Sequence, residues 1–159
     1  MGKRKINGEI TYGMEGSIFV AGSAIQWLRD GLNFFESASD TENLLQQARK
    51  DSKVVVVPAL TGLGAPHWDP EARGAIYGLS RDSGIAEITK ATLESIAYQT
   101  KDLLEAMRQD GAEIKELKID GGMVANSWFS QELANVLNIK TEKISTLHLE
   151  ILRNPGQER

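Results

Sequence analysis

The stretch that most constrains the fold of this chain covers residues 117–137. Hydrophobic and polar residues alternate over 117–119, which predicts a half-buried strand, and Gly121 and Gly122 follow almost at once. Residues 127–137 then show the spacing of an amphipathic helix. A strand, a glycine turn and a helix N-terminus expose backbone N–H groups beside a surface without side chains. Such a surface suits a flat or anionic ligand, and an ordinary turn is the alternative.

A second glycine of interest, Gly22, falls inside another predicted helix over residues 18–30. In the middle of a helix a glycine lowers helix stability by roughly 1 kcal/mol relative to alanine. A compensating role for Gly22 is therefore expected. Gln26 lies one turn further along the same face. Two interpretations are open. Either Gly22 lets another helix approach closely, or a ligand ring lies against the bare glycine while Gln26 hydrogen-bonds it.

The remaining pattern predicts a mixed α/β domain in layers. Ser39 and Glu42 have the spacing of a capping box, which predicts a helix from there to about residue 50. Four consecutive valines within 53–57 predict a strand that is covered on both faces. Further strands are expected over 9–12 and 74–79, and the longest helix over 85–109; beyond residue 139 the pattern is hard to interpret.

The loop over residues 61–70 is rich in glycine and proline and carries His67 and Trp68. It is either a binding surface or an ordered connection held in place by Trp68. No second histidine or carboxylate has the spacing to complete a metal site or an acid–base pair with His67, which we interpret as non-catalytic. We also find no phosphate-binding loop, nucleophile elbow or dinucleotide fingerprint in the sequence.

Charge and composition favour no nucleic-acid or membrane partner. The formal net charge is -4, and there are no cysteines for disulfides or thiolate metal sites. The longest apolar runs, such as the four valines, are far shorter than the ~20 residues of a membrane-spanning helix. The first eight residues are polar and do not resemble a signal peptide. We therefore expect a cytoplasmic protein.

Long ungapped runs of the sequence resemble glycerol kinases. A glycine pattern over 74–79 followed by residues 87–94 also fits a signature of the wider family of sugar and polyol kinases. The resemblance covers about residues 7–139 and favours glycerol kinase over relatives that act on gluconate, xylulose or ribulose. The runs that carry it are residues 15–30, 61–69, 91–100 and 120–126.

The resemblance implies an actin-like ATPase (ribonuclease H-like) architecture, in which two domains of one fold close on a cleft. ATP lies mostly on the C-terminal domain and glycerol mostly on the N-terminal one. Residues 6–143 are expected to form part of the C-terminal domain, and residues 144–159 an unmatched tail that is a candidate for disorder. By motif match, Gly22 and Gln26 contact the nucleotide from one side, and Gly122 and Asn126 contact it from the other.

The resemblance further implies that the complete enzyme moves the γ-phosphoryl group of ATP, bound with Mg²⁺, to glycerol. This chain is expected to lack the glycerol-binding domain, to be incomplete at both ends and to be inactive alone. We assign it no catalytic and no metal-binding residue. The alternatives are a non-catalytic actin-like interaction module, whose open sheet edge recruits partners or copies of itself, and a fragment of another polyol or sugar kinase. Homo-oligomerisation is left open.

Overall fold

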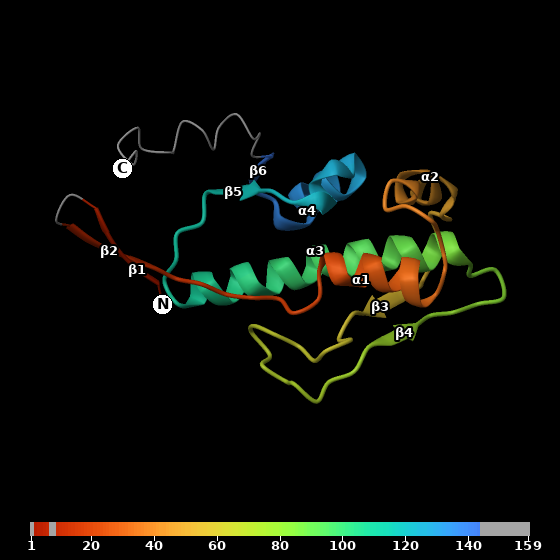
Figure 1. Cartoon of the computed structure of the whole chain (residues 1–159), viewed down its shortest axis with the longest axis horizontal. Coiled ribbons are helices and arrows are strands. Elements are labelled where there is room, and N and C mark those ends of the chain that lie inside the picture. The colour runs from red at the N-terminus through yellow and green to blue at the C-terminus, as the bar shows by residue number, and fades with distance from the viewer. Residues whose placement is uncertain (1, 7–8, 144–159) are drawn as a thin grey trace, which may run out of the picture.

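Helix α3, Ile85–Gln109, is the longest element, and three helices and a strand pack against it (Figure 1). The computed structural model describes the backbone of residues 2–6 and 9–143 and the side chains of residues 14–143. Helices α1 (Gly22–Gln26), α2 (Asp40–Gln47) and α4 (Ser127–Leu137) all contact α3. Strand β3 (Val55–Val57) contacts α3 as well.

The described strands form three separate two-stranded sheets. Strands β1 (Gly2–Ile6) and β2 (Glu9–Gly13) make an antiparallel hairpin, and β3 pairs antiparallel with β4 (Ala75–Tyr77). Strands β5 (Glu116–Ile119) and β6 (Lys140–Lys143) are parallel, and α4 connects them. Parallel neighbours need such a crossover, so this unit is a β–α–β element.

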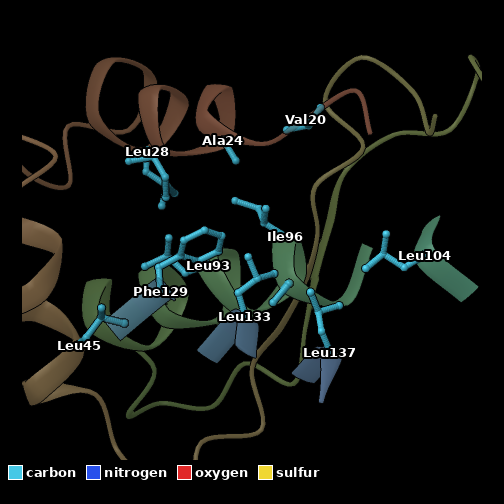
Figure 2. Packing of buried hydrophobic residues seen from close by; sticks show 12 residues of the cluster. Val20, Ala24, Leu28, Leu45, Leu93, Ile96, Leu104, Phe129, Leu133 and Leu137 are labelled. Carbon is cyan, nitrogen blue, oxygen red and sulfur yellow. The ribbon is translucent and has the colours of Figure 1, made fainter. Parts of the chain in front are cut away.

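The hydrophobic core lies between α3, α1 and α4 (Figure 2). Leu28 is fully buried, and Leu93 and Ile96 of α3 are nearly so. From α4, Phe129 and Leu133 point into the same cluster. The core is therefore mainly helical, and it fixes α1 and α4 relative to α3.

Several predicted elements are confirmed. Helices α3 and α4 have the expected bounds, and strands β2 and β5 lie where alternation placed them. Local signals set both ends of α4: the Asn126 side chain accepts the Phe129 N–H at 2.8 Å, and Asn138 ends the helix with a left-handed backbone, φ 50°. Strands β1 and β6 were not expected.

The prediction for the first helix is partly wrong. Gly22 opens α1 instead of lying in its middle, and the helix continues as a π-helical turn, η1 (Trp27–Gly31). The segment before Gly22 is not helical because it packs against the loop over 61–69. There the Ser17 carbonyl accepts the Ala65 N–H at 2.9 Å. The mid-helix cost assigned to Gly22 therefore does not arise.

Two further predictions need correction. The Ser39 side chain makes no capping hydrogen bond, so the predicted capping box at α2 does not form. Strand β3 is covered on one face only: α3 buries Val54 and Val56, whereas Val55 is 53% exposed. The reason is that the sheet has only two strands and one helix layer, so the four valines alternate between inside and outside.

Trp68 does not serve as a buried pin for the loop over 61–70. Its side chain is 62% exposed and makes an edge-on contact with Phe19, at 6.2 Å between ring centroids. The loop is held by backbone hydrogen bonds, including a reciprocal pair between Leu63 and Asp69. The expectations for residues 144–159 lie outside the described part of the chain. Within that part, none of the helices is both long and apolar enough to cross a membrane.

Candidate functional site

A cavity of about 410 Å³ lies between α1, the start of α2 and the 3-10 turn η2 (Gly122–Ala125) that precedes α4. All four residues assigned from the resemblance line it: Gly22, Gln26, Gly122 and Asn126. They come from segments far apart in the sequence, and the packing of α1 and α4 on α3 brings them together. The other lining residues are Ile25, Arg29, Ala38, Ser39, Thr41, Glu42, Leu93, Met123 and Ala125.

The two glycines differ in their surroundings. A Cβ atom on Gly122 would meet nothing within 4 Å, so this part of the wall is open. A Cβ atom on Gly22 would lie 3.7 Å from Sδ of Met123, so the methionine side chain covers Gly22. The close neighbour of Gly22 is thus a side chain of η2 and not another helix. The Met123 side chain is an unbranched thioether, a type that tolerates repacking.

The amide groups of the two polar residues have different tasks. The Gln26 side chain is exposed and makes no hydrogen bond with the described residues, so its donors and acceptor are available to a ligand. Asn126 is occupied: its Oδ1 caps α4, and its Nδ2 donates to Oγ1 of Thr41 at 2.9 Å. Thr41 is 2% exposed and in turn donates to the Ala38 carbonyl. Asn126 therefore connects two walls of the cavity and keeps only one N–H and one lone pair for a ligand.

A second connection between these walls involves Glu42. Its Oε1 accepts the backbone N–H of Ser127, the first residue of α4, at 2.6 Å. A carboxylate at a helix N-terminus is favourable because the helix dipole is positive there. Sequence reasoning missed this role because it assigned Glu42 to the start of its own helix. No local spacing reveals a partner 85 positions away.

The positive charge beside the cavity is already paired. The Arg29 guanidinium donates to both carboxylate oxygens of Asp30, at 2.6 and 2.9 Å. The hydrogen bond from Arg29 lowers the pKa of Asp30, which keeps this pair charged. Glu42 is therefore the one lining residue with a charge that no cation of the described chain balances through an ion pair.

The described residues contain no cluster of three or more metal-ligating side chains. Among residues 14–143 no three histidine, aspartate or glutamate side chains group so that they could hold an ion. His67 lies outside the cavity, with its Nε2 3.9 Å from Oδ2 of Asp102, and both side chains are about half exposed.

Residues 4–152 match the FGGY family of carbohydrate kinases, C-terminal domain. The chain therefore belongs to this family, which confirms the expected fold class.

Among the members of this family, the chain is most usefully compared with glycerol kinases. It is 56% identical to the glycerol kinase of Marinomonas sp. strain MWYL1 and 55% identical to glycerol kinase 1 of Pseudomonas aeruginosa. Each comparison covers 87% of this chain but only 28% of the relative. The chain thus spans somewhat more than a quarter of the length of these proteins.

Solved structures show the same fold. A glycerol kinase from Plasmodium falciparum, determined with ADP, matches with a TM-score of 0.71 and 31% identity. That match covers 77% of this chain and 24% of the other. A ligand-bound xylulose kinase from Lactobacillus acidophilus matches with a TM-score of 0.71 and 26% identity, over 80% of this chain and 26% of the other.

Proposed function

We propose that the cavity between α1, α2 and η2 binds the nucleoside part of ATP, and that this chain is the corresponding portion of a glycerol kinase. The observation that carries the proposal is the convergence of Gly22, Gln26, Gly122 and Asn126 on one cavity. Its volume lies within the range of about 300–1,000 Å³ that is usual for small-molecule sites. The identity of 55–56% to two bacterial glycerol kinases supports glycerol as the substrate of the complete enzyme.

In this proposal each lining residue has a task that its geometry permits. The open backbone at Gly122 lets a planar group lie against this wall of the cavity. On the side of Gly22, the Met123 side chain adjusts to cover the other face of that group. The free amide of Gln26 donates to or accepts from the ligand. Asn126 holds the start of α4 against α2 and adds its remaining N–H.

The complete enzyme would transfer the γ-phosphoryl group of ATP to a terminal hydroxyl group of glycerol in the cytoplasm. Phosphoryl transfer depends on positioning and on charge neutralisation, which require both walls of a closed cleft. Mg²⁺ is usually held by substrate phosphates, water and one or two carboxylates, so in the proposal the ATP phosphates bring the ion into the cleft. We therefore expect the isolated chain to bind adenine nucleotides weakly and to be inactive.

The test is Gly122→Trp, measured by calorimetric titration of the chain with ADP. Because nothing lies within 4 Å of a Cβ atom on Gly122, the indole can enter the cavity without displacing the fold. We expect ADP binding to be lost and the melting temperature to change little. Glu113→Trp is the matched control, since Glu113 is 83% exposed and does not line the cavity. Unchanged ADP affinity in Gly122→Trp would show that the site is elsewhere.

The rival function, a non-catalytic interaction module, predicts a different outcome. Such a module would form a dimer whose stability does not respond to ADP, because its contacts would use a sheet edge and not the cavity. Size-exclusion chromatography with and without ADP separates the two cases. A monomer that ADP stabilises supports the kinase proposal.

A further inference from the structure

The feature that goes beyond the nucleotide site as such is the fixed carboxylate of Glu42. One oxygen, Oε1, accepts the Ser127 N–H at 2.6 Å, so the side chain is anchored to the first residue of α4. The other oxygen, Oε2, has no hydrogen-bond partner among the described residues, and Glu42 lines the cavity. Glu42 therefore gives the wall an anchored, negatively charged acceptor that is available to a ligand.

Charge decides which end of a nucleotide can lie beside Glu42. Among the described residues that line the cavity, the one cation is Arg29, which is paired with Asp30 through two hydrogen bonds. The wall at Glu42 is consequently negative, and it repels phosphate groups. The part of a nucleoside diphosphate or triphosphate that lies farthest from its phosphates is the base. The base is therefore the part that can approach Glu42.

Hydrogen-bond chemistry points to the same group. The ionised Glu42 side chain can only accept hydrogen bonds, and the Ser127 N–H takes one lone pair of Oε1 and leaves Oε2 free. A free carboxylate oxygen is the partner that an N–H of an exocyclic amino group requires. We propose that Glu42 selects the base, because its free oxygen accepts a hydrogen bond from the 6-amino group of adenine. This inference rests on the proposed function, since it requires the nucleotide in this cavity.

The expected consequence is a preference for a 6-amino purine over a 6-oxo purine. ADP donates an amino N–H to the carboxylate, whereas inosine diphosphate (IDP) carries a 6-oxo acceptor in that place, so this hydrogen bond is lost. A hydrogen bond to a charged group, or its loss in a buried site, changes affinity by roughly tenfold or more. We expect the chain to bind ADP at least about tenfold more tightly than IDP.

The discriminating variant is Glu42→Gln. Its amide oxygen can still accept the Ser127 N–H, while its NH₂ group replaces the free acceptor with a donor. Calorimetric titration with ADP and IDP should show weaker ADP binding and tighter IDP binding, so that the preference disappears or reverses. Asp40→Asn is the control, because Asp40 lies in the same turn of α2, accepts the Ser37 N–H and does not line the cavity. It should leave both affinities unchanged.

Each remaining outcome decides against the inference. If Glu42→Gln keeps the ADP-to-IDP affinity ratio of the unsubstituted chain, Glu42 does not contact the base. An equal loss for both nucleotides would indicate a purely structural role, and the proposed function would stand. If the ratio is unchanged, and 2′-deoxy-ADP binds more weakly than ADP to the unsubstituted chain but as well as ADP to Glu42→Gln, Glu42 contacts the ribose instead. If the unsubstituted chain fails to bind ADP, both this inference and the proposed function are wrong.

Discussion

Replacing Asn126 tests how the two walls of the cavity are held together. Asn126→Ala removes the N-cap of α4, in which Oδ1 accepts the Phe129 N–H at 2.8 Å. Loss of such a cap costs about 1 kcal/mol. The same substitution removes the hydrogen bond from Nδ2 to Oγ1 of the buried Thr41, which contributes about another 1 kcal/mol. The free energy of unfolding should therefore fall by about 2 kcal/mol. For a chain of this size the melting temperature should decrease by about 4–8 °C.

Asn126→Ser divides this loss into its two parts. A serine caps a helix about as well as an asparagine, but its side chain is too short to reach Thr41. We expect about half of the decrease seen with alanine, measured by circular dichroism at the helical band during heating. Two results would refute the reasoning. Equal decreases for the two variants would mean that the cap contributes nothing, and melting temperatures equal to that of the unsubstituted chain would mean that neither hydrogen bond matters.

Two further predictions concern the rest of the fold. Backbone N–H groups of Arg49 and Gly84 donate to the Glu87 carboxylate and lower its pKa from the usual 4.5. The stabilising effect of the charged Glu87 is therefore present at neutral pH and is lost as the pH falls below about 4.5. The difference in melting temperature between the unsubstituted chain and Glu87→Gln should decrease on acidification. A difference that does not change with pH would contradict this. Leu28→Ala, at a fully buried position, should lower the free energy of unfolding measured in urea by about 2–5 kcal/mol. Leu79→Ala, at a side chain that is 59% exposed, should lower it by less than about 0.5 kcal/mol. Similar decreases for the two variants would contradict the assigned core.

The sequence predicted those parts of the fold that local signals determine. Helices α3 and α4 were found with their bounds because a long 3.6-residue period and nearby end signals are all contained within the segment. The start of α1 at Gly22 was not predicted, because the loop over 61–69 keeps the preceding residues from becoming helical. The exposure of Val55 was missed for a similar reason: four valines do not reveal how many layers cover a strand.

In the candidate site, too, the features that depend on local sequence could be predicted and those that depend on tertiary packing could not. Periodicity and glycine placement alone led only to a turn that could hold a ligand, and the four residues were chosen through their resemblance to glycerol kinases. Their placement around one cavity depends on the packing of α1 and α4 against α3. The roles of Thr41 and Glu42 could not be predicted, because their partners Asn126 and Ser127 lie 85 positions further along the chain.

The span of those two hydrogen bonds has a consequence for how a ligand would affect the whole chain. A nucleotide that contacts both α2 and η2 would act as a reversible cross-link, because it would hold together two segments that are far apart in the sequence. At a concentration one hundred times its dissociation constant it would add about 2.7 kcal/mol to the free energy of unfolding. The concentration of nucleotide would then determine the folded fraction of the chain as well as the occupied fraction of the cavity.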